Sequence, residues 1–430
     1  MLNKKQTEFF EEAMRGTNIF LTGVAGTGKS YLTKEIIKAF EQKDKNIVVC
    51  ATTGVAARAI GGSTLHHQFH IDVTTDKVRE KKNINDWLKI TDLLIIDEIS
   101  MLSFHLFNTI TNEIKTYNPD CQLIVIGDFF QLPPIVTKET QAILRSRGYK
   151  VKSSKCHCFH AKNWRTLNFK VCELTEPMRQ QDADFAKALQ DLKNGCLDKQ
   201  DKDFLRVAQT HSYFNNDEAV TLTCTNKAAN EINNDKLTQL KGAPKVYEAT
   251  YWGLYDKEIS KKLFLKKGAK VILTTNKDKS YCNGDIGWVE ELNSDCISVK
   301  LLNGEIIEVE PYEFNTYVVE NEDGTLKTKL VGSIKQFPVK LAWAMTVHKS
   351  QGQTFESVNF LYDEGMFKGC EENLTLLYVG ISRVKSIEKL YLRFKSTLPQ
   401  FVNDDIVEFY QGNYETYYRD WDKNNETFGF

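Results

Sequence analysis

The sequence predicts an α/β protein with two parallel-sheet domains and a small antiparallel β insert in the second. Short, continuously apolar segments such as Leu93–Asp97 and Leu123–Asp128 recur with enough chain between them to cross over, as in parallel sheets covered on both faces. A second series of such segments lies between residues 220 and 394. Inside it, from residue 241 to 337, short β-like segments alternate with hairpin signals such as Asn303–Gly304, which indicate the insert.

The composition is that of a folded protein in which neither sign of charge dominates. The chain has 430 residues, with 56 Lys and Arg against 57 Asp and Glu, and a net charge of −1. This balance excludes a wholly basic nucleic-acid wrapper and an acidic disordered tail, so any nucleic-acid site must be a local patch. No run approaches the roughly 18 apolar residues of a membrane span, and the N-terminus lacks the apolar stretch of a secretory signal. We therefore expect a soluble, cytoplasmic protein whose ten scattered cysteines are reduced thiols.

The first apolar segment, Asn18–Thr22, runs into the glycine-rich loop Gly23–Ser30 (GVAGTGKS), and an amphipathic helix follows. This is the GxxxxGK[ST] pattern between a strand and a helix. Its glycines let backbone N–H groups surround a phosphate chain, the helix N-terminus adds its dipole, and Lys29 supplies a positive charge. The hydroxyl of Ser30 can ligate Mg²⁺. The loop therefore predicts a site for a nucleoside triphosphate.

Acidic and amide side chains follow two later apolar segments. Asp97 and Glu98 come at the end of LLIID, where Asp97 would hold Mg²⁺ through water and Glu98 would polarise the attacking water. The next segment leads into GDFFQLPP, which brings Gln131 to the same sheet edge, where it can sense the γ-phosphate. Together with the phosphate loop, these residues predict an NTPase, without indicating what its hydrolysis drives.

A specific resemblance to a known family covers residues 6–385. It rests on eight segments in this order: GVAGTGKS, ATTGVAARAIGGSTLHHQF, DEIS, GDFFQLPP, LTEPMRQQDADFAKALQDLKNG, TCTNKAANEIN, MTVHKSQGQTF and LYVGISRVKS. The series resembles the PIF (petite integration frequency) group of superfamily-one 5′-to-3′ DNA helicases, related to the RecD and Dda helicases. The resemblance implies two RecA-like parallel-sheet domains with a small wedge insert and an SH3-like antiparallel β insert. The implied domains are a RecA-like domain 1A at 1–170 with a small 1B wedge near 70–90, a RecA-like domain 2A at 171–244 and 338–430, and an SH3-like 2B insert at 245–337.

The resemblance also implies roles for individual residues. Arg179 and Arg383 would reach the γ-phosphate from the second domain, where a guanidinium stabilises the charge that develops during phosphoryl transfer. Gln6 would read the adenine edge, and Gln351 with Gly352 would lie beside both nucleotide and DNA. The implied phosphate-loop contacts are Gly23, Gly26, Thr27, Gly28, Lys29 and Ser30. The implied contacts with single-stranded DNA, all suited to phosphates rather than base edges, are Thr53, Ser63, Thr64, His66, Thr225, Asn226 and His348.

On this basis we expect a monomeric enzyme that uses ATP and Mg²⁺ to move 5′-to-3′ along single-stranded DNA and to unwind forked or tailed duplex DNA. The resemblance to this group adds G-quadruplexes as an expected substrate, RNA–DNA hybrids are a further candidate, and no membrane partner is expected. Three alternatives stay open at this point. They are a single-strand DNA translocase that displaces proteins without opening duplex, a non-motor P-loop NTPase switch or small-molecule kinase, and a passive single-strand binding protein.

Three local patterns allow more than one interpretation. The stretch 65–70 (LHHQFH) can contact DNA phosphates, hold a metal or pack in the core. The pattern Cys156-His157-Cys158-x-His160, followed by Cys172, can bind zinc, although we favour buried thiols and a solvated histidine because CxC spacing suits one tetrahedral site poorly. Lysines of the β insert can form a positive patch for DNA or a solvated face. These lysines are Lys261, Lys262, Lys266, Lys267 and Lys270.

Overall fold

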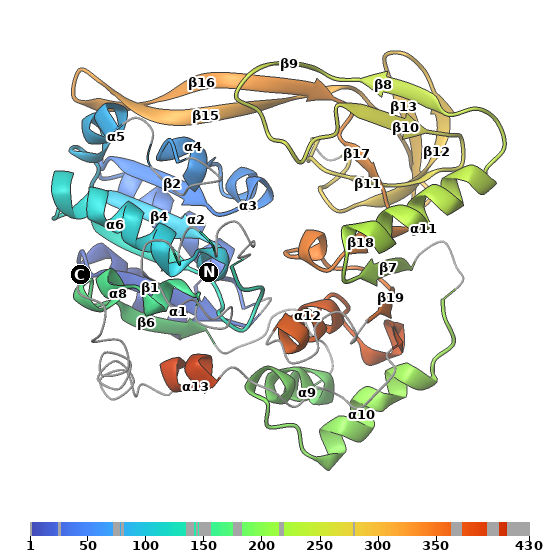
Figure 1. Cartoon of the computed structure of the whole chain (residues 1–430), viewed down its shortest axis with the longest axis horizontal. Helices are drawn as coiled ribbons and strands as arrows, with labels where there is room; N and C mark the ends of the chain where they lie inside the picture. Colours follow the sequence, from blue (N-terminus) through green and yellow to red (C-terminus); the bar gives the residue numbers. More distant parts are fainter. Residues whose placement is uncertain are drawn as a thin grey trace.

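A computed structural model gives the fold of the chain (Figure 1). It describes residues 2–24, 27–71, 78, 81–134, 142, 145, 156–174, 183–214, 219–277, 280–362, 372–393 and 404–410. The first α/β domain lies on the left of the view, the second at the lower right, and the β insert above the second domain. Within the described residues, no helix is both long and apolar enough to cross a bilayer.

The first domain is built on a six-stranded parallel sheet with the strand order β3-β2-β4-β5-β1-β6. Its strands are β1 (Ile19–Gly23), β2 (Ile47–Ala51), β3 (Ser63–Thr64), β4 (Leu93–Asp97), β5 (Gln122–Ile126) and β6 (Lys170–Leu174). Its helices are α1 (Lys4–Met14), α2 (Lys29–Glu41), α3 (Gly54–Ala59), α4 (Leu65–Gln68), α5 (Lys81–Leu88), η1 (Ile99–Met101), α6 (Phe104–Tyr117), η3 (Cys158–His160) and α8 (Lys162–Thr166). The predicted parallel sheet is therefore present.

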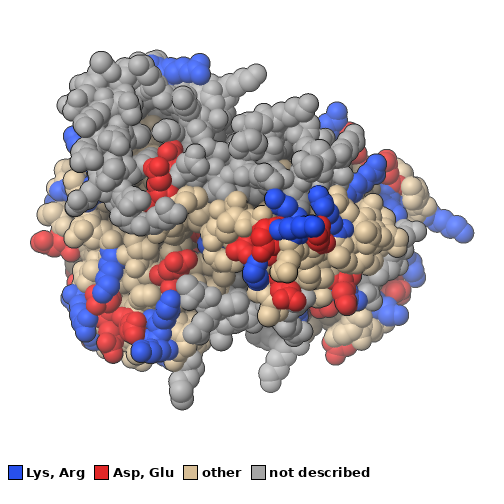
Figure 2. Space-filling view, turned by 90° about the horizontal axis from the view of Figure 1, so that it is seen from below, with Lys and Arg blue, Asp and Glu red and all other residues tan. Residues whose placement is uncertain are grey.

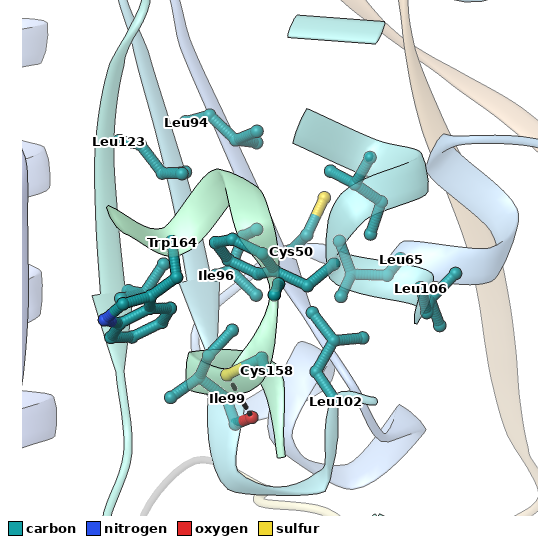
Figure 3. Packing of buried hydrophobic residues seen from close by; sticks show 14 of the residues in the cluster. Cys50, Leu65, Leu94, Ile96, Ile99, Leu102, Leu106, Leu123, Cys158 and Trp164 are labelled. Carbon is teal, nitrogen blue, oxygen red and sulfur yellow. Dashed lines mark hydrogen bonds between the residues drawn. The ribbon is translucent and has the colours of Figure 1, made fainter. Parts of the chain in front are cut away.

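The two faces of this sheet are both buried, which explains why its strands are continuously apolar. In β4, Leu93 and Ile95 pack with residues of α1 and α2, whereas Leu94 and Ile96 pack with residues of α6 and α8 on the other face. Figure 3 shows part of this second cluster, in which the Cys158 thiol donates to the carbonyl of Ile99 (S···O 3.6 Å).

The cysteine and histidine segment belongs to the core of the first domain. Cys156 and Cys158 are buried, and burial raises the pKa of the Cys158 thiol, as expected for inert thiols. The expectation of a solvated histidine is wrong, because His157 and His160 are only 3% and 2% exposed, and burial lowers the pKa of His157 to about 3. The part of the chain that the structure describes contains no group of three or more side chains that could hold a metal ion.

The second domain has a four-stranded parallel sheet with the order β18-β7-β19-β20. Its strands are β7 (Val220–Thr223), β18 (Ala344–Thr346), β19 (Val358–Leu361) and β20 (Leu390–Arg393). Its helices are α9 (Ala183–Asn194), α10 (Lys199–Thr210), α11 (Asn226–Gln239), η4 (His348–Ser350), α12 (Glu372–Ile381) and η6 (Ile387–Lys389). Helices α9, α10 and α12 pack with the strands around one apolar core.

The insert consists of antiparallel strands, as the hairpin signals predict. A five-stranded sheet has the order β14-β13-β12-β11-β17, β8 pairs with β10, and a third sheet has the order β15-β16-β9. The strands are β8 (Lys245–Glu248), β9 (Thr250–Gly253), β10 (Lys262–Leu265), β11 (Lys270–Leu273), β12 (Ile286–Leu292), β13 (Ile297–Leu301), β14 (Ile306–Val309), β15 (Tyr312–Glu322), β16 (Thr325–Gln336) and β17 (Val339–Leu341). The long β15–β16 hairpin crosses the top of Figure 1 from the insert to α5 of the first domain.

Three segments lie on the other side of the predicted domain boundaries. Strand β6 pairs with β1 as far as Leu174, so the first sheet continues past residue 170. Strand β17 pairs with β11, so the insert continues past residue 337. Helix α13 (Asp404–Tyr410) follows the second domain in sequence, yet its Phe409 packs in the core of the first domain. The remaining boundaries stay predictions.

The surface seen from the side of α9, α10 and α13 carries mixed charge. On the described part of this face, Lys and Arg side chains are interspersed with Asp and Glu (Figure 2). This agrees with the near-zero net charge of the chain.

Candidate functional site

The candidate site lies at the carboxyl ends of neighbouring strands in the first sheet. The central strands have the order β4-β5-β1. The phosphate loop follows β1, the Asp97–Glu98 pair ends β4, and the segment Asp128–Leu132 follows β5. Because parallel strands all end at one edge, the fold gathers these three segments where α/β proteins bind ligands.

The phosphate loop needs glycine at two described positions. Gly23 has a φ of +144°, and a Cβ there would lie 2.3 Å from the carbonyl oxygen of Leu174. Gly28 caps α2 with a φ of +86°. The Lys29 ammonium donates to the carbonyls of Gly23 (2.7 Å) and Val24 (3.2 Å), so it lies within the loop. Burial lowers the pKa of Lys29, and the nearby carboxylates oppose that shift.

The remaining loop positions have different environments. Thr27 is buried, and its hydroxyl donates to the carbonyl of Val24 (2.9 Å), whereas Ser30 is exposed on the first turn of α2. Gly26 lies outside the described residues, so its predicted role is untested.

Asp97 and Glu98 form a compact acidic pair. Asp97 Oδ1 accepts the backbone N–H of Glu98 (2.8 Å), and Glu98 has a left-handed backbone with φ 54°. Burial raises the pKa of both carboxyls, and the charge of Asp97 further raises the pKa of Glu98, which reaches about 7. A crowded pair of partly buried carboxylates is a donor set that suits a divalent cation such as Mg²⁺.

One residue of the second domain reaches this pair directly. The side-chain amide of Gln351 donates to Glu98 Oε2 (3.0 Å) and to Gln131 Oε1 (3.2 Å). Gln351 follows η4, and Gly352 after it has a φ of +79°, a conformation that favours glycine. The structure therefore brings together three residues that the sequence predicted in separate motifs.

Arg383 follows α12 and is 1% exposed. Its guanidinium donates to the carbonyls of Val379 (2.8 Å), Ser350 (3.2 Å) and Gln353 (3.2 Å). Its charge also lowers the pKa of Glu98, so it acts electrostatically on the site. The other predicted arginine, Arg179, lies outside the described residues.

Gln6 is buried at the start of α1, where it forms a capping box with Asn3. Its Oε1 accepts the Asn3 backbone N–H (3.0 Å), and its own N–H donates to Asn3 Oδ1 (2.8 Å). The Gln6 Nε2 group has no hydrogen-bond acceptor among the described residues. A buried donor without an acceptor suits an adenine ring nitrogen. The geometry of Gln6 is therefore compatible with the predicted reading of the adenine edge, which stays a prediction.

The predicted DNA contacts lie at the carboxyl edges of both sheets. The hydroxyls of Thr53, Thr64 and Thr225 cap α3, α4 and α11, so each is placed by the helix that follows a strand. The other predicted contacts lie in or next to these elements. Ser63 precedes Thr64 in β3, His66 lies in α4, Asn226 is the first residue of α11, and His348 is the first residue of η4. Burial lowers the pKa of both His66 and His348, which favours the neutral form of their imidazoles.

The lysines of the insert do not form the proposed positive patch as a set. Lys270 is 1% exposed and donates to the carbonyl of Ala219 (2.6 Å), so neither the positive patch nor the solvated face includes it. Lys266 donates to the carbonyl of Leu240 (2.9 Å), and Lys262 pairs with a glutamate.

Sequence reasoning missed an ion pair beside this site. Lys193 of α9 and Asp128 after β5 are both buried, with 3.4 Å between Nζ and Oδ1. Asp128 lies in GDFFQLPP and Lys193 in LTEPMRQQDADFAKALQDLKNG. Their local signals are an acid after a strand and a lysine on an apolar helix face. Only the three-dimensional structure shows that these two residues form a pair.

Comparison with known proteins adds independent information. The sequence profile of the PIF1-like helicases matches residues 1–203. The chain is 30% identical to an ATP-dependent DNA helicase Pif1 of Campylobacter jejuni, over 93% of this chain and 96% of that protein. Among solved structures, Bacteroides sp. Pif1 in complex with ADP-AlF4 matches with a TM-score of 0.82 and 28% identity, covering 97% of this chain and 98% of that one. Bacteroides Pif1 bound to single-stranded DNA matches with a TM-score of 0.69 and 28% identity, over 97% of each chain.

Proposed function

The chain belongs to the PIF1-like helicase family and is an ATP-dependent DNA helicase; from this premise we propose how its residues act and on which DNA. The protein moves 5′-to-3′ on single-stranded DNA and unwinds forked or tailed duplex, as a monomer. G-quadruplexes and RNA–DNA hybrids are further substrates of the same motor. The observation that carries the proposal is the double hydrogen bond from Gln351 of the second domain to Glu98 and Gln131 of the first.

The phosphate loop binds the triphosphate of ATP. Binding requires the Lys29 ammonium to leave the carbonyls of Gly23 and Val24 and to turn to the phosphates, which are stronger acceptors. Ser30 and Asp97 would hold Mg²⁺, whose charge neutralises the phosphates when it is bound. Their fit rests on the exposed hydroxyl at the start of α2 and the acidic pair at the end of β4.

Glu98 orients and polarises the water that attacks the γ-phosphate, and Gln131 senses that phosphate. Arg383, with Arg179, stabilises the developing charge from the second domain. Because Gln351 bonds both Glu98 and Gln131, a change in the γ-phosphate alters the contact between the domains. The two domains thereby alternate between closed and open states.

The DNA-contacting groups of the two domains lie at the carboxyl edges of the two sheets, around the caps of α3, α4 and α11. Opening and closing of the domains changes the distance between these two sets of contacts. A strand that each set grips in turn is moved in one direction. The wedge near α5 then disrupts base pairs ahead of the motor.

The direct test is unwinding of a short fluorescent duplex by the purified chain with ATP and Mg²⁺. We expect unwinding with a 5′ single-stranded tail and little with a 3′ tail. Equal unwinding of both substrates would exclude the proposed polarity. A single-strand translocase would hydrolyse ATP on the tail without releasing the strand, and a non-motor switch would show no stimulation of its ATPase by single-stranded DNA.

A further inference from the structure

A buried ion pair joins the second domain to the segment that carries Gln131. Lys193, near the C-terminal end of α9, is 2% exposed, and Asp128, just after β5, is fully buried. Their charged atoms are 3.4 Å apart. Helix α9 and helix α13 both lie at the lower edge of the first view (Figure 1), and the Lys193 ammonium lies 4.8 Å from the Phe130 ring and 5.6 Å from the Tyr410 ring.

Asp128 organises the turn that follows it. Its Oδ1 accepts the backbone N–H of Phe130 (3.1 Å), and its carbonyl accepts the backbone N–H of Gln131 (2.8 Å). The next residue, Leu132, is 1% exposed and packs in the core of the second domain with Leu189 of α9. The turn Asp128–Leu132 is therefore held at both ends, by its own strand and by α9.

The charge of Lys193 matters because Asp128 lies close to the phosphate loop. Among the neighbouring carboxylates, Asp128 raises the pKa of Lys29 most. Its Oδ2 has no hydrogen-bond donor among the described residues. A buried carboxylate needs a counter-charge, and without Lys193 the carboxylate would compete for Lys29 or move the turn toward water.

We propose that Lys193 is a positioning residue for ATP hydrolysis, which acts through Asp128 to hold the Asp128–Leu132 turn, and with it Gln131, against the second domain. The proposal rests on the γ-phosphate role proposed above for Gln131. It assigns to α9 a direct mechanical contact with the ATP site. Lys193 does not touch ATP, so its loss should lower the rate of hydrolysis more than the affinity for ATP.

The test is steady-state ATPase of the full chain with saturating single-stranded DNA, using Lys193→Met, Asp128→Asn, the double variant and Gln131→Ala. Methionine keeps the length of the lysine side chain and removes its charge. We expect Lys193→Met to lower kcat about tenfold and to change KM for ATP less than about twofold. Lys187→Met is the matched control, because Lys187 lies on the same helix, is exposed, and pairs with Asp191 and Asp201; it should keep kcat within about twofold of wild type.

The double variant shows whether Lys193 acts through Asp128. In the Asp128→Asn background, Lys193→Met should cause no further loss of kcat beyond about twofold. This comparison still applies if Lys193→Met alone does not fold, because the double variant contains no lone buried charge. The proposal is overturned if Lys193→Met keeps wild-type kcat, if KM rises as much as kcat falls, or if the losses multiply in the double variant. Wild-type kcat in Gln131→Ala would instead remove the role proposed for Gln131.

Discussion

Glu98 is the residue whose ionisation should set the pH dependence of hydrolysis. A general base must be ionised to accept a proton, and burial raises the pKa of Glu98 to about 7. We therefore expect kcat/KM for ATP, which reports the nucleotide-free enzyme, to rise as the pH increases between about 6 and 8 and then to level off. Glu98→Gln should lower kcat by at least about 100-fold and remove this rise. The measurement is the pH profile of the DNA-stimulated ATPase.

The stability of the nucleotide-free protein gives a second readout of the same carboxyl. Because the pKa of Glu98 is higher in the folded chain than the ordinary value of 4.5, its contribution to stability is present at low pH and is lost as the pH rises through about 7. Glu98→Gln should therefore raise the melting temperature at pH 8 and lose this advantage near pH 4. Glu41→Gln, at an exposed position of α2, is the control. An increase in melting temperature that was the same at pH 4 and pH 8 would contradict the raised pKa of Glu98.

The residues of the site divide into those that local sequence can identify and those that it cannot. Lys29, Asp97 and Glu98 were predictable, because a phosphate needs glycines and a cation, and because an acidic pair after an apolar strand lies at the sheet edge. The contact of Gln351 with Glu98 crosses 253 residues, and that between Lys193 and Asp128 joins two domains. Such partners depend on how the domains meet, which no local pattern encodes.

At the scale of elements, the long β15–β16 hairpin has a specific anchor in the first domain. Gln68, at the end of α4, is fully buried and forms two hydrogen bonds with the backbone of Val319, one with its N–H and one with its carbonyl, both 2.8 Å. Asn321, at the hairpin tip, donates to the carbonyl of Asp86 in α5 (2.9 Å). The Gln68 side chain thus pairs with the hairpin in the manner of a neighbouring strand.

We expect Gln68→Ala to loosen this anchor and to destabilise the docked hairpin by about 1–3 kcal/mol, since it leaves partly buried backbone groups of Val319 without partners. Amide hydrogen exchange of residues 314–328 in the DNA-free protein would measure the change as faster exchange. Asn321→Ala, which removes two exposed hydrogen bonds, one to Asp86 and one from the Gly324 N–H, should have a smaller effect. Unchanged exchange in Gln68→Ala would mean that apolar packing alone holds the hairpin.

Most elements were predictable, and the exceptions have physical reasons. The continuously apolar β4 and the Asn303–Gly304 turn follow directly from burial on two faces and from turn stereochemistry. Strand β6 begins with the exposed residues Lys170 and Val171 at the edge of its sheet, so its apolar signal is weak. The return of α13 to the first domain depends on Phe409 and the apolar cluster that receives it, which come from opposite ends of the chain.

At the scale of the whole molecule, the chain can act as a motor only if the state of ATP changes the contact between its two domains. The described contacts across the ATP site are few and of different kinds. Gln351 reaches Glu98 and Gln131 by hydrogen bonds, Lys193 reaches Asp128 by charge, and Leu132 enters the core of the second domain. Gln351 is the contact nearest to the proposed chemistry, so it should link DNA binding to hydrolysis.

We expect Gln351→Ala to lower kcat of the DNA-stimulated ATPase about tenfold, because Glu98 and Gln131 lose their common partner in the second domain. Gln351→Glu should lower it further, since a third carboxylate beside Glu98 repels that residue and opposes domain closure. Gln239→Ala, at the exposed end of α11, is the control and should stay within about twofold of wild type. Titrating single-stranded DNA into the ATPase assay measures all three. If Gln351→Ala kept the full stimulation by DNA, the link between the domains would have to run through the ion pair and the apolar contact alone.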